Sequence, residues 1–307
     1  MSGSPARPAI SASELLAAVP QLGDVAELRV CELSNVPGAN LSPALATQAI
    51  AAASEAVAEG AAGAVITQGT DTIEETGALA ELIWPHEEPL VITGAIRPGG
   101  SLGSDGPLNL LDAVRVAAAG VARGAGPLVV FDGTVHGAGV AVKSHSWRSD
   151  AFSSESPLGR VREGRVNLER AHRTRTPVAS PAEAAAAALD SYVPILAAAA
   201  GMDARPLDAL RADGAAAIVA VSLGAGHLPE AMLPGVDRAL EAGLPLVVSA
   251  RPERGGTLEW TYGFEGSESD LARRGAILAG AASPWKARIR VLLALGLGRA
   301  PRELFPA

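Results

Sequence analysis

Short apolar runs bounded by turn-forming residues alternate with helical segments in the first half of the chain. Ala64–Thr67 and Leu90–Thr93 are apolar runs containing β-branched residues that suit buried parallel strands. Further helices are predicted at Ser42–Glu59, Glu74–Ile83 and Asn109–Ala118, and further strands at Leu28–Leu33, Pro127–Phe131 and Ala138–Val142. This alternation predicts an α/β fold with a parallel sheet, in which ligands bind at the carboxyl ends of the strands.

A second α/β pattern follows a stretch of different character. Arginines cluster at Arg160, Arg162, Arg165, Arg170, Arg173 and Arg175, which we interpret as a solvated surface. An Ala-rich segment then leads to further strands at Val193–Leu196, Ala217–Val221 and Leu246–Ser249, and to a last helix at Lys286–Leu295. We therefore predict an N-terminal domain over residues 1–172, a linker over 173–192 and a C-terminal domain over 193–307.

Composition limits the class of protein. The chain has 307 residues, of which 48% are hydrophobic, so it can build a sizeable core. Its formal net charge of −8 argues against a nucleic-acid partner, because binding to phosphates needs clustered positive charge. No apolar run approaches the ~20 residues of a membrane span. The single cysteine, Cys31, favours a reduced, cytoplasmic setting, conditional on Met1 lying near the true start.

The turn after the first of these buried strands carries an unusual density of polar groups. Thr67, Thr70, Asp71 and Thr72 surround Gly69, which allows close approach of the backbone. A helix N-terminus explains one threonine and the following acids, but it does not require all four polar residues. The turn therefore indicates a site for an anion or a carboxylate. A second loop, Gly94–Pro107, follows the next strand and suits backbone contact with a ligand.

The basic residues are almost all arginine, with two lysines, Lys143 and Lys286. Lys143 ends an apolar strand beside Ser144, and a lysine in such a position can serve as a general base for a hydroxyl. We expect a functional role for Lys143 and a structural role for Lys286. The histidines show no metal-ligand spacing, so no metal site is expected. Gly224-Ala225-Gly226 lacks the third glycine of a dinucleotide fingerprint.

Together, these segments resemble the bacterial-type L-asparaginase/glutaminase family over most of the chain. The blocks that carry the resemblance are Ala64–Gly77, with Thr-Gln-Gly-Thr-Asp-Thr at its centre, Val91–Ala113, Leu223–Pro229, Gly255–Tyr262 and Pro284–Leu295. The resemblance implies an α/β enzyme of two domains: a larger N-terminal domain with a parallel or mixed sheet and helices on both faces, and a smaller flavodoxin-like domain. It also implies a homodimer or homotetramer, with no metal or organic cofactor.

The resemblance assigns roles to particular residues. Thr70, Asp71 and Lys143 match the family's catalytic group: a hydroxyl that attacks or activates water, a carboxylate that holds the α-amino group, and a lysine that moves the proton. The backbone near Ala95 would face the amide oxygen, Gly38 and Ala39 lie where the family often has a serine for the α-carboxylate, and Gly69 lies in the catalytic turn. Glu268 matches a glutamate that reaches a neighbouring subunit's site, and His227 stands where many members have asparagine.

One part of the family pattern is missing. Members begin with a strand that ends in a Thr-Gly-Gly-Thr-Ile-type motif carrying the principal nucleophilic threonine, and this sequence contains no such motif. Either Met1 is an internal methionine of a longer protein or the protein is a degenerate member. We expect the first, because every other block is intact. Translating the upstream DNA in frame tests it, since a Gly-Gly-Thr motif should appear within a few dozen codons.

These observations predict an amidohydrolase that converts L-asparagine to L-aspartate and ammonia by threonine-based catalysis. The alternatives are an L-glutaminase or mixed enzyme, and a catalytically impaired binding protein that retains the pocket for an acidic amino acid. A phosphate-binding α/β domain would need a basic residue in the glycine-rich turns, where Arg97 is the one candidate.

Overall fold

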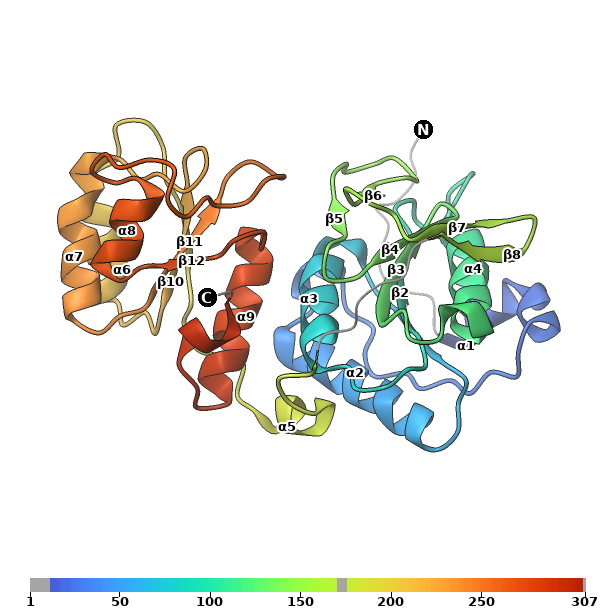
Figure 1. The fold of residues 1–307 in the computed structure, drawn as a ribbon. Helices are drawn as coiled ribbons and strands as arrows, with labels where there is room; N and C mark the ends of the chain where they lie inside the picture. Colours follow the sequence, from blue (N-terminus) through green and yellow to red (C-terminus); the bar gives the residue numbers. More distant parts are fainter. Residues whose placement is uncertain (1–11, 170–175, 306–307) are drawn as a thin grey trace. The chain divides into compact units, whose positions relative to one another are not determined.

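A computed structural model describes residues 12–169 and 176–305. The chain divides into two compact units, Met1–Ala185 and Ala186–Ala307 (Figure 1). His172 and three arginines of the predicted cluster, Arg170, Arg173 and Arg175, lie outside the described residues. No helix within the described ranges combines the length and the apolar character needed to cross a bilayer.

A six-stranded mixed sheet forms the centre of unit 1, in the order β1-β2-β3-β4-β7-β8. The strands are β1 (Ala64–Thr67), β2 (Leu90–Thr93), β3 (Pro127–Phe131), β4 (Thr134–Gly137), β7 (Gly159–Arg162) and β8 (Arg165–Leu168). β1, β2 and β3 are parallel, whereas β4, β7 and β8 continue the sheet in antiparallel pairs. Thr67 of β1 pairs with Thr93 of β2, so the two polar loops leave the sheet side by side.

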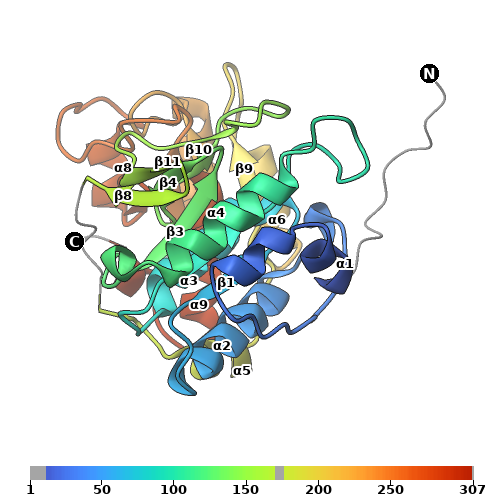
Figure 2. The same ribbon diagram turned by 90° about the vertical axis from the view of Figure 1, so that its right-hand side faces the viewer.

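Helices cover both faces of this sheet (Figures 1 and 2). On one face, α4 packs Ala113 and Val116 against Val91, Leu128 and Val130 of the strands. On the other face lie α2 and α3, whose Ile50, Leu79 and Ile83 are fully buried. The helices of unit 1 are α1 (Ala12–Ala17), α2 (Pro43–Ala58), α3 (Ile73–Ile83) and α4 (Gly106–Ala118), with short 3-10 turns η1 (Pro20–Asp24), η2 (Gly38–Asn40), η3 (Thr70–Thr72) and η4 (Gly120–Ala122).

Two of the predicted strands are wrong. Leu28–Leu33 forms no strand, and Leu28, Val30 and Leu33 are 37–47% exposed. The apolar pattern alone cannot make a strand, because the backbone needs a neighbouring strand to pair with, and none pairs with this segment in the described part of the chain. The predicted strand Ala138–Val142 is mostly a turn, since the strand lies earlier, at β4.

The missed β3–β4 hairpin had a sequence signal. Asp132 and Gly133 connect the two strands with positive φ angles of 48° and 67°. A two-residue Asp-Gly loop with both residues in this region is the favoured type I′ hairpin turn, because its twist matches that of the strands. The turn reverses the chain and makes the sheet mixed instead of wholly parallel.

A separate two-stranded hairpin carries the predicted catalytic lysine. It consists of β5 (Val142–Lys143) and β6 (Phe152–Ser153), which pair with each other in antiparallel orientation. The six-stranded sheet does not include them. Lys143 is therefore placed by contacts between this hairpin and the rest of unit 1.

Unit 2 contains a four-stranded, wholly parallel sheet in the order β12-β11-β10-β9. Its strands are β9 (Ile195–Ala197), β10 (Ile218–Ser222), β11 (Leu246–Ala250) and β12 (Ile277–Leu278). Its helices are α6 (Arg205–Ala212), α7 (Leu233–Glu241), α8 (Glu268–Arg274) and α9 (Pro284–Gly296), with 3-10 turns η5 (Glu230–Met232) and η6 (Pro301–Leu304). α6, α7 and α8 cover one face and α9 the other (Figure 1).

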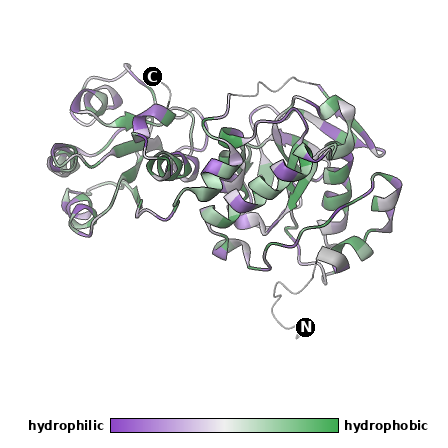
Figure 3. Cartoon of the chain, turned by 90° about the horizontal axis from the view of Figure 1, so that it is seen from below, coloured by the Kyte–Doolittle hydropathy of each residue, from purple (hydrophilic) through white to green (hydrophobic). Residues whose placement is uncertain are grey.

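The central strands of both sheets are hydrophobic (Figure 3), whereas β7 and β8 at one edge of the larger sheet carry exposed arginines. Every residue of β2, β3, β10 and β11 is buried. A short helix, α5 (Pro181–Ala186), contains the boundary between the two units. The fold is thus the predicted two-domain α/β architecture, with a mixed sheet flanked by helices and a smaller parallel sheet.

Candidate active site

The polar turn between β1 and α3 owes its shape to two glycines in close contact. A Cβ added to Gly69 would lie 2.5 Å from both N and Cα of Gly38, so neither position has room for a side chain. The hydroxyl of Thr72 also donates to the Gly38 carbonyl oxygen at 3.1 Å. This contact fixes η3, and with it the positions of Thr70 and Asp71.

The three predicted catalytic residues lie together. Lys143 Nζ is 2.9 Å from Thr70 Oγ1 and 2.9 Å from Asp71 Oδ1. Thr70 is buried, the side chain of Lys143 is 19% exposed, and that of Asp71 is 59% exposed. One side of this group is therefore enclosed by the protein, while the Asp71 carboxylate remains open to a ligand.

This geometry can move a proton. The lysine ammonium donates to the threonine hydroxyl and to the carboxylate, and the neutral amine can accept the hydroxyl proton along the same 2.9 Å contact. The carboxylate stabilises the lysine cation and retains a second oxygen for other donors. The group therefore has the parts of an activated nucleophile and of a site for a positive ligand.

The second polar loop, which follows β2, is held by a buried amide and a carboxylate. Asp105 accepts hydrogen bonds from the backbone amides of Ile96 and Arg97, and Asn109 donates to the Gly94 carbonyl oxygen at 3.0 Å. Ala95 lies in this loop and is partly exposed. Sequence reasoning missed Asp105 and Asn109, although both lie in the Val91–Ala113 block that carries the family resemblance.

Gly38 and Ala39 lie in η2 next to this turn. Gly38 is buried, with its Cα against Gly69 and its carbonyl oxygen taken by Thr72. Ala39 is exposed. The predicted binding position can therefore offer a ligand only Ala39 and backbone atoms of η2.

The other two predicted residues form a cluster of their own in unit 2. Glu268 is fully buried and accepts a hydrogen bond from the backbone amide of Tyr262 at 2.6 Å. Its other carboxylate oxygen is 3.2 Å from His227 Nε2. The imidazole ring meets the rings of Tyr262 and Phe264 edge to face, with centroids 4.9 and 5.0 Å away. Sequence reasoning missed this aromatic pair.

Charge and hydrogen bonding act against each other at Glu268. Burial by itself raises the pKa of this carboxyl, but hydrogen bonds from the backbone amides of Tyr262, Glu268 and Thr261, together with the nearby His227, lower the pKa further than burial raises it. Glu268 is therefore ionised at neutral pH, and its two oxygens are occupied by groups of unit 2.

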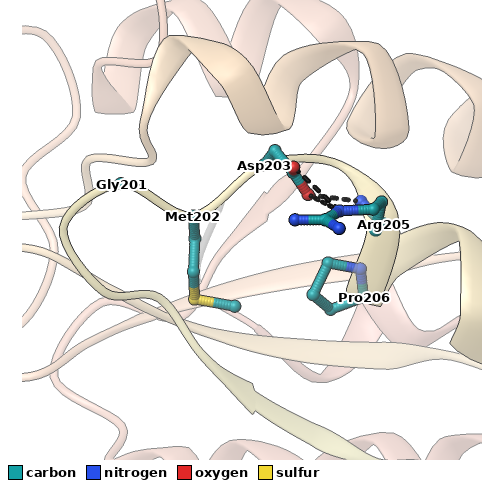
Figure 4. Close-up of a pocket in the computed structure, with 5 residues that line it drawn as sticks. All are labelled: Gly201, Met202, Asp203, Arg205 and Pro206. Carbon is teal, nitrogen blue, oxygen red and sulfur yellow. Dashed lines mark hydrogen bonds and ion pairs between the residues drawn. The ribbon is translucent and has the colours of Figure 1, made fainter.

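Unit 2 also contains a pocket. A pocket between β9 and α6 is lined by Gly201, Met202, Asp203, Arg205 and Pro206, and an ion pair joins Asp203 to Arg205 (Figure 4). It contains none of the predicted site residues. Within residues 12–169 and 176–305, no three His, Cys, Asp or Glu side chains are grouped to hold a metal ion.

Comparisons with known proteins define the class. The N-terminal asparaginase family model matches residues 1–174, and the glutaminase/asparaginase C-terminal domain model matches residues 192–305. The fold and these two matches define an amidohydrolase of the asparaginase type. The chain belongs to the L-asparaginase/glutaminase family.

Individual relatives agree with this assignment. A probable L-asparaginase of Deinococcus radiodurans is 34% identical over 88% of this chain and 82% of its own length. A glutaminase-asparaginase of Pseudomonas aeruginosa is 30% identical over 96% of this chain and 81% of its own length. A probable cytoplasmic L-asparaginase of Campylobacter jejuni has a solved structure that matches with a TM-score of 0.86 at 30% identity, covering 96% of this chain and 92% of that one.

Proposed function

We propose that the protein hydrolyses L-asparagine to L-aspartate and ammonia, with Thr70, Asp71 and Lys143 as its catalytic group. The observation that carries the proposal is the position of Lys143 Nζ, 2.9 Å from both the Thr70 hydroxyl and the Asp71 carboxylate. The family membership and the relatives named L-asparaginase support the choice of substrate.

In the proposed reaction, Lys143 as the neutral amine accepts a proton from the Thr70 hydroxyl or from a water that this hydroxyl orients. The oxygen attacks the side-chain amide carbon, and the C–N bond breaks as the nitrogen takes the proton from Lys143 and leaves as ammonia. If Thr70 is the attacking group, one water then hydrolyses the ester, which releases aspartate and restores the hydroxyl.

The remaining groups would bind the substrate. Asp71 has an exposed carboxylate that suits the α-ammonium group of asparagine. The backbone at Ala95, held by Asp105 and Asn109, would face the amide oxygen. Ala39 and the backbone of η2 would contact the α-carboxylate. On the strength of the family resemblance we include His227 in the binding machinery, with Glu268 holding its imidazole in place.

The assembly and location of the protein belong to the same proposal. A homodimer or homotetramer would cover the apolar residues Leu258, Trp260, Tyr262 and Phe264, which are 38–83% exposed in unit 2. A cytoplasmic location is supported by the name of the Campylobacter relative, whereas a relative from Haemophilus influenzae is named periplasmic.

Ammonia release from purified protein tests the function. We expect release from L-asparagine, a loss of about 10³-fold in Thr70→Ala, and no change in the control Thr134→Ala, whose hydroxyl lies on β4. Activity that survives Thr70→Ala unchanged would contradict the mechanism.

One alternative has specific support. The Pseudomonas relatives named glutaminase-asparaginase favour a mixed enzyme, which equal release of ammonia from L-glutamine would establish.

A further inference from the structure

The hairpin that carries Lys143 has little secondary structure of its own. β5 and β6 contain two residues each and pair with each other outside the six-stranded sheet. A two-stranded hairpin is marginally stable alone. The 2.9 Å contacts of the lysine therefore depend on whatever attaches the hairpin to the rest of unit 1.

Two contacts attach β6 to the sheet. Phe152 stacks on Phe131 of β3, with ring centroids 4.4 Å apart, and both rings are buried. Just after β6, the Ser154 hydroxyl is 2.8 Å from Nδ1 of His136 on β4, whose imidazole is also buried. These contacts fix one strand of the hairpin, but they do not touch the strand that carries the lysine.

Glu74 supplies a contact to β5. Its Oε1 accepts a hydrogen bond from the backbone amide of Lys143 at 3.1 Å. Glu74 lies in the first turn of α3, four residues after Thr70, and is partly buried. One carboxylate thus connects the turn that holds the hydroxyl to the backbone of the lysine that faces it.

We propose that Glu74 is a positioning residue: it fixes the Lys143 backbone relative to η3, so that Nζ reaches both Thr70 Oγ1 and Asp71 Oδ1. The inference rests on the proposed function, because it gives Glu74 a role in that same catalytic group. It does not place Glu74 in contact with the substrate. The group needs an acceptor oxygen at this position rather than a charge, so glutamine should substitute for glutamate.

Steady-state kinetics of ammonia release test the catalytic consequence. We expect Glu74→Ala to lower kcat about 10–100-fold with KM within about threefold, because a small misplacement of a catalytic group is costly while substrate binding is retained. Glu74→Gln should restore kcat to within about threefold. Glu75→Ala removes a carboxylate from the same helical turn and should leave kcat unchanged. Equal losses in the three variants, or no loss in Glu74→Ala, would overturn the proposal.

A second measurement reports on the environment of the Lys143 side chain and does not rely on activity. The chain has two lysines, so protein labelled with isotopic lysine gives two side-chain signals in an NMR spectrum, which Lys143→Arg assigns. In Glu74→Ala the Lys143 signal should shift or broaden, while the signal of Lys286, which lies in unit 2, stays in place as an internal reference. Glu74→Gln and Glu75→Ala should keep both signals. An unmoved Lys143 signal in Glu74→Ala would overturn the proposal.

The two readouts separate the possible failures. If the wild-type protein releases no ammonia, the proposed function fails, and the NMR comparison still decides whether Glu74 positions the lysine. If Glu74→Ala does not fold, Glu74→Leu, which fills the space without an acceptor, takes its place beside Glu74→Gln. A Lys143 signal that is the same in Glu74→Leu and Glu74→Gln would then contradict the role of Glu74.

Discussion

Two clusters of charged residues in this chain use similar chemistry in opposite ways. In unit 1, Lys143 joins Thr70 and Asp71, and the Asp71 side chain is 59% exposed. In unit 2, His227 joins Glu268, but Glu268 is fully buried and its oxygens are occupied by His227 and by backbone amides. The first cluster can offer its carboxylate to a ligand, whereas the second uses its carboxylate to hold a loop.

This difference shows that matching a residue to a family position does not establish what its atoms are free to do. Asp71 and Glu268 were both predicted as site residues. The contacts leave the Asp71 carboxylate available to a ligand. Glu268 is instead bonded to His227, whose ring packs against Tyr262 and Phe264. The comparison predicts that substitutions in the Thr70–Asp71–Lys143 cluster mainly lower activity, and that substitutions in the His227–Glu268 cluster mainly lower stability.

The largest expected effect is on activity, in Lys143→Met. Removing the amine leaves Thr70 without a proton acceptor, so kcat for ammonia release should fall about 10³-fold. The melting temperature should change little, because the partly exposed Asp71–Lys143 pair contributes about 1 kcal/mol to stability. A variant with a much lower melting temperature but an unchanged kcat would contradict the comparison.

The counterpart in unit 2 is Glu268→Ala, which should act on stability. It leaves the Tyr262 amide and the His227 imidazole without this partner, at a cost of about 1–3 kcal/mol for each group in the free energy of unfolding. Glu268→Gln keeps an acceptor oxygen and should lose less. Chemical denaturation followed by far-ultraviolet circular dichroism measures the effect, and a Glu268→Ala protein as stable as the wild type would contradict it.

A pH effect of roughly 3 kcal/mol is expected at His136. Burial, and to a lesser extent the charge of Arg160, lowers the pKa of this imidazole from 6.5 to about 4. The unfolded chain therefore binds a proton between pH 6.5 and 4 that the folded chain does not, so the free energy of unfolding should fall as the pH drops through this range. His136→Asn should flatten this part of the profile, whereas the exposed control His145→Ala should not.

The smallest effect is expected at the start of α8. The Ser267 side chain accepts a hydrogen bond from the Asp270 amide and caps the helix that carries Glu268. Ser267→Ala should cost about 1 kcal/mol of stability, measured by thermal unfolding, and Ser267→Asp should restore most of it. A loss as large as that of Glu268→Ala would mean that the cap, rather than the carboxylate, holds the loop.

Local patterns in the sequence predicted most of the fold. The apolar runs at β1, β2, β3, β10 and β11 are long enough and sufficiently uniform to show their strands directly. The polar turn at Thr70 and Asp71 was visible because its residues are contiguous, and Lys143 was visible because lysine is rare in this chain.

The parts that sequence reasoning missed depend on pairing over long distances. Leu28–Leu33 has the composition of a strand but no partner to pair with in the described chain. Glu74 lies 69 residues before Lys143 in the sequence, yet it accepts a hydrogen bond from the Lys143 backbone amide. The enclosure of Glu268 depends on the loop at Tyr262, and no local pattern encodes how that loop folds over it.

The central claim is that Thr70 and Lys143 act as one catalytic unit, and a double-mutant cycle tests it most directly. We would compare kcat for ammonia release from L-asparagine in the wild type, Thr70→Ala, Lys143→Met and the double variant. Residues that act as a unit give non-additive losses, so the double variant should be no slower than the slower single variant. Losses that multiply, or a wild-type protein that releases no ammonia, would contradict the account.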